Sequence, residues 1–134
     1  MSVIPMKKVY PFDDGFDYIV DKRLKNALPR GTGEAKKLWR ENRLDLWVAP
    51  GKGFLLIQKK LNREHGDTLF IYAIEGRDLQ RSSGFETLRK LAIMDGCKWI
   101  ECRAFDERQA RALSWFGFEL INFDGVEYTL RKEV

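Results

Sequence analysis

The residues whose types and spacing best suit chemistry lie where a predicted strand gives way to a helix. The strand ends at residues 74–76 and the helix opens at residues 81–86. The first amides of a helix have no acceptor within the helix, and the helix dipole favours an anion beside them. Gly84 lets a phosphate approach the backbone, and Arg77 and Arg81 add positive charge. The candidate contacts to such an anion are Ile74, Gly76, Arg77, Arg81, Ser82, Ser83, Gly84, Phe85 and Glu86.

The same helix start has a second interpretation that needs no ligand. Ser83 and Glu86 have the spacing of a capping box, in which a serine hydroxyl and a glutamate carboxylate bind backbone amides of the first turn. The local sequence alone favours this cap over an anion site, so both interpretations stay open at this point.

The elements that must position these residues are predicted from the hydrophobic periodicity. Apolar residues recur at helical spacing in four segments, the first of which is ended by Pro29 and Arg30. Six other segments show alternating apolar and polar residues or short runs rich in β-formers, which is typical of strands. The turn Asp124-Gly125 joins the last two of these segments as a hairpin. The predicted helices are 16–28, 34–44, 83–95 and 107–116, and the predicted strands are 45–49, 54–61, 68–75, 98–105, 118–123 and 126–132.

The order of these elements predicts the topology of the sheet. Three consecutive strands joined by turns form an antiparallel meander. A helix between two strands normally makes a right-handed parallel crossover, so the sheet should be mixed. The fold class is α/β (α+β), with a mixed, mostly antiparallel sheet flanked by helices, and residues 1–134 form one domain.

The order of elements and the residues at two turns resemble the GNAT superfamily of N-acetyltransferases. In that superfamily a Q/R-x-x-G-x-G/A loop holds the pyrophosphate of acetyl-CoA, and Arg81 and Gly84 match this loop. A later N-x-x-A…G-F helix lies beside the pantetheine arm; Asp106 stands where the superfamily usually has Asn, and Gly117 and Phe118 match the helix end. The topology covers residues 35–134. The chain is also similar to small acetyltransferase-like proteins of tailed phages, some of which are virion components.

The resemblance implies acetyl-CoA as cofactor, an amine as acceptor, and Asp106 as a further cofactor contact. A transferase needs a base that takes a proton from the amine. Glu75, at the exit of the central strand where the thioester should lie, is the candidate, although a solvated strand-end carboxylate is the simpler interpretation. His65, the only histidine, is predicted to be an exposed turn residue.

Two positions depart from the superfamily pattern. Glu86 replaces the small residue that lets the loop close on the pyrophosphate, and it places a carboxylate near two phosphates. At ~6 Å and an effective dielectric near 20, this costs roughly 3 kcal/mol per unit charge before nearby arginines offset it. Leu113 stands where family members often have a tyrosine that protonates the leaving thiolate. Ser114, a poor acid, is the nearest hydroxyl and the remaining catalytic candidate.

Composition and charge limit which other classes of function are possible. With 44% hydrophobic and 13% aromatic residues, the chain can bury a core. The positive excess lies in residues 1–67 and is interleaved with acids, as on a solvated helix face, so nucleic acid is not a favoured partner. No apolar run approaches the ~20 residues of a membrane span, and residues 1–10 contain no continuous apolar stretch of the ~7 residues that a signal peptide requires. We expect a cytoplasmic protein, or one in the host cytoplasm or virion if it is phage-encoded.

The two cysteines predict neither a disulfide framework nor a metal site. Cys97 and Cys102 are five residues apart near a strand, so their side chains should point to opposite faces. They have no C-x-x-C spacing and no histidine nearby, and two buried thiols is the simpler interpretation.

Two classes of function follow. The first is an acetyl-CoA-dependent N-acetyltransferase acting on an amine acceptor. The alternative is a catalytically inactive member of the same fold used as a binding or structural module, for example in a virion or as an inhibitor of a host protein, and Glu86 and Leu113 motivate it.

Overall fold

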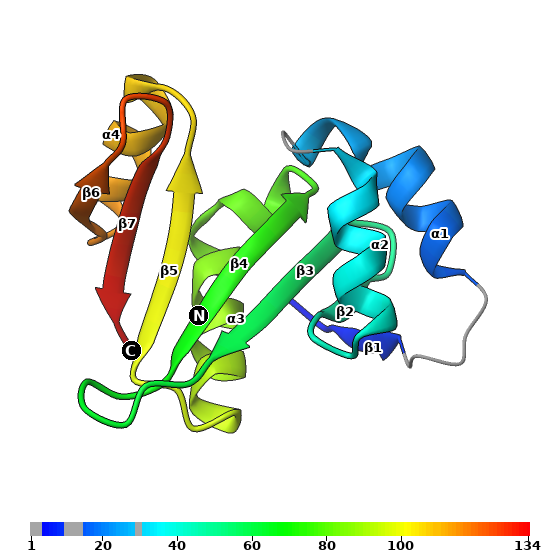
Figure 1. Cartoon of the computed structure of the whole chain (residues 1–134), viewed down its shortest axis with the longest axis horizontal. Coiled ribbons are helices and arrows are strands. Elements are labelled where there is room, and N and C mark those ends of the chain that lie inside the picture. The colour runs from blue at the N-terminus through cyan, green and yellow to red at the C-terminus, as the bar shows by residue number, and fades with distance from the viewer. Residues whose placement is uncertain (1–3, 10–14, 29–30) are drawn as a thin grey trace.

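The computed structural model of the chain describes residues 4–9, 15–28 and 31–134. One seven-stranded sheet organises them, in the order β1-β2-β3-β4-β5-β7-β6 (Figure 1). Within the described residues β4 and β5 form the one parallel pair, so the predicted mixed, mostly antiparallel sheet is confirmed. The strands are β1 Lys7–Val9, β2 Asp45–Ala49, β3 Gly53–Lys60, β4 Thr68–Glu75, β5 Trp99–Ala104, β6 Glu119–Phe123 and β7 Tyr128–Glu133.

The helices keep the predicted order but differ in two places. The segment predicted as one helix over 16–28 changes its hydrogen bonding twice, from α to π to 3-10, and its predicted end at Pro29 and Arg30 lies outside the described residues. The helix predicted at 34–44 is α2, which ends earlier because the chain turns through Asn42 at φ 60°. The helical elements are α1 Phe16–Ile19, η1 Val20–Leu24, η2 Lys25–Ala27, α2 Thr32–Arg40, η3 Asp78–Gln80, α3 Ser82–Met94 and α4 Glu107–Trp115. None of the helices in these residues combines the length and apolarity needed to cross a bilayer.

Helices cover the two faces of the sheet, and β3 shows how the sequence directs this. Leu55 and Ile57 point toward α3 on one face, while Leu56 points toward α1 and α2 on the other. All three are buried, because side chains alternate along a strand and both faces are covered. On the α1–α2 side the rings of Phe16 and Trp39 stack with centroids 4.1 Å apart and close that cluster.

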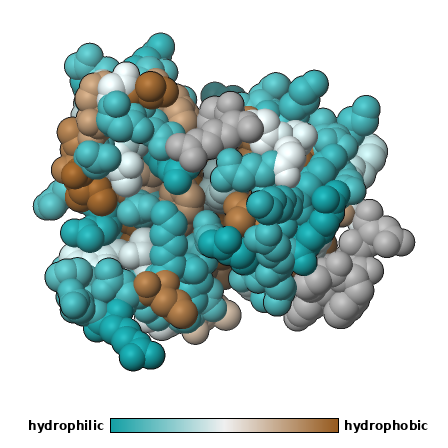
Figure 2. Space-filling model, in the orientation of Figure 1, coloured by the Kyte–Doolittle hydropathy of each residue, from teal (hydrophilic) through white to brown (hydrophobic). Residues whose placement is uncertain are grey.

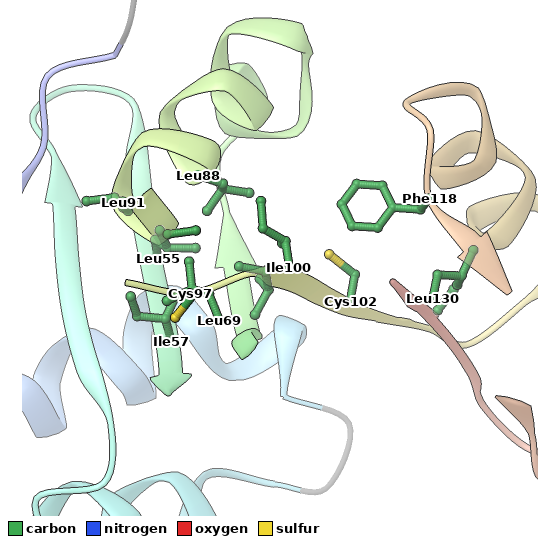
Figure 3. Packing of buried hydrophobic residues seen from close by; sticks show 13 residues of the cluster. Leu55, Ile57, Leu69, Leu88, Leu91, Cys97, Ile100, Cys102, Phe118 and Leu130 are labelled. Carbon is green, nitrogen blue, oxygen red and sulfur yellow. The ribbon is translucent and has the colours of Figure 1, made fainter. Parts of the chain in front are cut away.

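The larger buried cluster lies between α3 and the centre of the sheet. Leu88 and Leu91 of α3 pack over strand residues from β3, β4 and β5 (Figure 3). Phe118 and Leu130 extend the cluster to the strands beyond β5. This continuous apolar layer fixes the position of α3 relative to β4, and so fixes where the helix begins.

β4 and β5 run side by side for only part of their length and then diverge (Figure 1). Their pairing covers Thr68–Phe70 on β4 and Trp99–Glu101 on β5. Beyond it, the β3–β4 register shifts so that Tyr72 is an extra residue on β4. A bulge of this kind bends its strand and is common next to active sites. In the part of the chain that the structure describes, the last residues of β4 therefore have no strand beside them on the β5 side.

Candidate functional site

A cavity of about 710 Å³ occupies the space between the diverging ends of β4 and β5. Its volume lies within the ~300–1,000 Å³ of typical ligand sites. β4 contributes residues 71–75, Gly76 follows it, and β5 contributes Cys102 and Arg103. The rest of the lining comes from both sides of the sheet: Arg23, Asn26 and Ala27 on one side, and Gln80, Phe85, Leu88, Phe105, Gln109, Ala112, Leu113 and Phe116 on the other.

The two sides of the cavity differ in chemistry. The side toward α3 and α4 is largely apolar, and the rings of Phe85 and Phe116 meet there with centroids 4.4 Å apart. The side toward η1 and η2 carries the charged groups Arg23, Glu75 and Arg103. The cavity therefore suits a ligand that has an apolar part and a polar part.

The start of α3 is an uncapped helix end, and the predicted capping box is wrong. The helix begins at Ser82, with Arg81 as its N-cap in extended conformation and no side chain bonded to the cap. The Glu86 carboxylate turns instead to Arg89, 3.2 Å away. Within the described residues, the amides of Ser82, Ser83 and Gly84 have no acceptor. Because the carboxylate leaves them free, these amides can serve as donors to an anion.

Gly84 is required by a contact within the protein itself. A Cβ placed on Gly84 would overlap the carbonyl oxygen of Leu79, which belongs to η3. The helix start and the η3 turn therefore touch through their backbones, and this contact sets the orientation of the free amides. The sequence predicted that Gly84 makes room for a phosphate; the structure shows that its first role is close packing against Leu79.

Glu75 ends β4 beside the polar side of the cavity. Its side chain is about one-third exposed, but its Oε2 atom is buried and accepts no hydrogen bond. The Nη2 atom of Arg23 lies 3.5 Å from Oε2, and the guanidinium also lies over the Phe54 ring, 5.0 Å from its centroid. Oε2 is thus enclosed beside Arg23 within the protein, and the exposed part of the Glu75 side chain is what a ligand in the cavity can reach.

The structure does not bring three of the other predicted residues to the cavity wall. Ser114 donates its hydroxyl to the carbonyl of Ala110 at 3.1 Å. Asp106 is the N-cap of α4, where its Oδ1 accepts from the amide of Gln109 at 2.7 Å. Arg77 is exposed in the loop before η3. Of the predicted set, Ile74, Glu75, Gly76 and Phe85 line the cavity, while Arg81, Ser82, Ser83, Gly84 and Glu86 form the adjoining helix start.

Sequence reasoning missed several residues of the cavity wall. Arg23 lies within a run of basic residues that resembles an ordinary solvated helix face. Arg103 occupies a polar position of an alternating strand, where it forms an ion pair with Glu127 at 3.6 Å. Tyr72 is the bulge residue, and no local pattern predicts a bulge. Only the π-helical turn at η1, a feature frequent at functional sites, could have drawn attention to Arg23, and it is not readable from sequence.

The two cysteines belong to the same buried cluster, so the prediction that they point to opposite faces is wrong. Cys97 precedes β5 and does not follow its alternation, whereas Cys102 lies within the strand. Burial raises the pKa of the Cys102 thiol from 9.0 to about 12, with a smaller contribution from Glu101. Burial also raises the pKa of Cys97. Both thiols therefore stay protonated in the folded protein at neutral pH.

Replacing Cys102 with alanine should flatten the alkaline pH dependence of stability. The unfolded thiol ionises near pH 9, but the folded thiol does not until about pH 12. The stability from this group is therefore complete below pH 9 and declines as pH rises toward 12, by up to about 1.4 kcal/mol per pH unit. Urea unfolding between about pH 8 and 10 measures this slope. Equal slopes in the variant and the parent protein would contradict the prediction.

Comparisons with known proteins identify the fold. Neither family models nor curated protein sequences match this chain. A chain of the NatC complex bound to Gag peptide and CoA has a TM-score of 0.66 at 11% identity, covering 99% of both chains. An acetyltransferase from Thermus thermophilus has a TM-score of 0.64 at 17% identity, covering 100% of both. A GNAT-family acetyltransferase from Listeria monocytogenes has a TM-score of 0.61 at 12% identity, covering 97% of this chain and 94% of that one. At these identities the likeness shows the fold, which is that of the GNAT acetyltransferases.

Proposed function

We propose that this protein is an acetyl-CoA-dependent N-acetyltransferase that transfers an acetyl group to an amine in the cavity between β4 and β5. One observation carries the proposal: the cavity adjoins the free amides of the α3 start and is lined, beside its polar side, by the Glu75 carboxylate. An anion site and a proton acceptor, joined by an apolar passage, are the parts that such a reaction needs. The shared fold with acetyltransferases, one of them bound to CoA, supports the same assignment.

The residues present fit acetyl-CoA. The amides of Ser82, Ser83 and Gly84 would bind the diphosphate, and Arg81 adds positive charge there. The end of β4, which has no neighbouring strand on the β5 side within the described residues, offers backbone groups to the amides of the pantetheine arm. Unpaired amides at the same place can polarise the thioester carbonyl. Bound acetyl-CoA supplies an activated acyl group with a good leaving group.

Glu75 acts as the base. Its carboxylate accepts a proton from the amine nitrogen as that nitrogen attacks the carbonyl carbon and the carbon–sulfur bond breaks. The thiolate of CoA leaves, since a thiol of pKa about 8.5 is stable enough as an anion to depart without an acid. Leu113, which lines the cavity where an acidic hydroxyl is often found, therefore does not prevent the reaction.

A non-catalytic binding module of the same fold is the second candidate, and Glu86 is the observation that favours it. The Glu86 carboxylate lies one helical turn from the amides that would hold the diphosphate, and Arg89 neutralises it only in part because both groups are partly exposed. Turnover separates the two candidates, because a binding module does not release CoA in the presence of an amine.

Replacing Glu86 with alanine should tighten acetyl-CoA binding about three- to tenfold, since it removes a negative charge near the diphosphate. Isothermal titration at low and high salt measures the gain, which screening should reduce. The matched control is Glu107→Ala, which breaks a similar helical ion pair with Arg111 at 2.9 Å on α4 and should leave the affinity unchanged. Weaker binding by the Glu86 variant would show that its carboxylate contributes to the site.

The proposed activity is tested by incubating the protein with acetyl-CoA and a panel of primary amines, including peptides with free N-termini. CoA release above the rate without acceptor, together with an acetylated product found by mass spectrometry, would support transfer. Binding of acetyl-CoA without release for any amine would favour the non-catalytic module.

A further inference from the structure

We propose that two copies of this chain associate through a surface formed by the end of α4, by β6 and by the turn after β6, here called the α4–β6 surface. Apolar side chains on it are unusually exposed: Trp115 86%, Leu120 55%, Ile121 44%, Phe123 50% and Val126 75%. All five residues of β6 are exposed, and β6 is an edge strand of the sheet. Figure 2 shows apolar surface at the edge of the molecule where Figure 1 places β6.

Apolar side chains of β6 lie on the same face of the sheet as the main buried cluster. Leu120 lies opposite Leu130, which is fully buried, and Phe123 lies opposite Tyr128, with ring centroids 4.3 Å apart. Residues directly opposite in an antiparallel pair share a face. α4 directs its inner residues to the main core and lies against β6 only in part, so Leu120 and Phe123 on the core-side face of β6 stay about half exposed. Such a face is expected to have a partner.

The size of the surface suits a second copy. From their exposed fractions, its five side chains present roughly 600 Å² of apolar area, because large side chains such as aromatic rings cover about 150–250 Å² each. A stable interface buries about 800 Å² per partner. The α4–β6 surface thus supplies most of one half of a standard interface before its rim is counted.

The α4–β6 surface is flanked by one positive and one negative side chain, which can pair between two copies. Arg108 lies seven residues before Trp115, which places both on the same exposed stripe of α4. Glu119 begins β6, and neither Arg108 nor Glu119 has an ion pair within the described residues. A two-fold contact places the same surface on both sides, so Arg108 of one copy can meet Glu119 of the other. The apolar centre and the paired charges together favour a dimer over an unrelated partner.

Sedimentation velocity tests the dimer. The parent protein at about 50 µM should sediment at twice the 15.7 kDa chain mass. Trp115→Glu and Phe123→Glu should each weaken association at least tenfold while leaving the far-UV spectrum unchanged, because both side chains are exposed. Leu61→Glu is the matched control: Leu61 is 77% exposed in the β3–β4 turn, and its variant should remain dimeric.

A charge exchange provides the second measurement. Arg108→Glu should weaken the dimer, and combining it with Glu119→Arg should restore it. A parent protein that stays monomeric at all concentrations up to about 200 µM would overturn the proposal and assign this surface to another partner. A dimer that survives both Trp115→Glu and Phe123→Glu would overturn it as well.

Discussion

Gly84→Ala should weaken acetyl-CoA binding at least tenfold and destabilise the protein by about 2–3 kcal/mol, since overpacking a backbone contact forces the chain to move. The added methyl group would overlap the Leu79 carbonyl, so η3 and the start of α3 cannot keep their contact. Neither partner is a flexible side chain that could turn away. The amides of residues 82–84 are the proposed donors to the diphosphate. A shift of the helix start would move all three of these donors away from it.

Gly33→Ala is the matched control, because it adds the same methyl group near the start of another helix. Nothing lies within 4 Å of a Cβ placed on Gly33. Its variant should bind acetyl-CoA like the parent protein and be equally or slightly more stable, since alanine favours helix over glycine by up to about 1 kcal/mol. Urea unfolding and isothermal titration measure both quantities. A Gly84 variant as stable as the Gly33 variant would contradict the Leu79 contact.

Glu75→Gln should lower kcat/KM for acetyl transfer by about 10²–10⁴-fold, the usual contribution of a general base. The substitution keeps the size of the side chain but removes the atom that takes the proton. Acetyl-CoA affinity should stay within about twofold, because the proposed diphosphate site is formed by the start of α3 and does not include Glu75. Rates of CoA release with the best amine of the panel provide kcat/KM, and titration provides the affinity.

Two further variants distinguish the role of Glu75 as a base from its role in the ion pair with Arg23. Arg23→Gln breaks the same 3.5 Å contact but leaves the carboxylate, so it should cost less than about tenfold. Glu101→Gln changes a partly buried carboxylate that pairs with Lys60 outside the cavity lining, and it should transfer at the parent rate. If Arg23→Gln lost as much activity as Glu75→Gln, the ion pair rather than proton transfer would be the important feature.

The fold was largely predictable because its elements carry strong local patterns. β3 and β4 are rich in β-formers between clear turns, and the Asp124-Gly125 turn between β6 and β7 follows from its sequence, with Asp124 accepting the amides of Val126 and Glu127. β1 was missed because its three residues are too few to show a period. The bulge at Tyr72 depends on the packing of β4 against its neighbours, which no local pattern contains.

The site was predictable only in part, because its residues come from distant segments. The helix start at Arg81 was found from one continuous motif. Its capping was predicted wrongly because Glu86 pairs with Arg89, a contact that depends on side-chain geometry. Arg23 and Arg103 reach the same cavity from residues far apart in sequence. Their meeting is a property of the sheet topology, so it could be seen only in the structure.

Isothermal titration of the unliganded protein with acetyl-CoA tests the central claim most directly. If the free amides after β4 and the cavity beside them form an acyl-CoA site, one equivalent should bind with a Kd in the micromolar range, about −8 kcal/mol, and free CoA should compete. The affinity should also fall as salt increases, because part of it comes from the diphosphate. No heat with acetyl-CoA at millimolar concentration would contradict the assignment and leave the fold without its proposed cofactor.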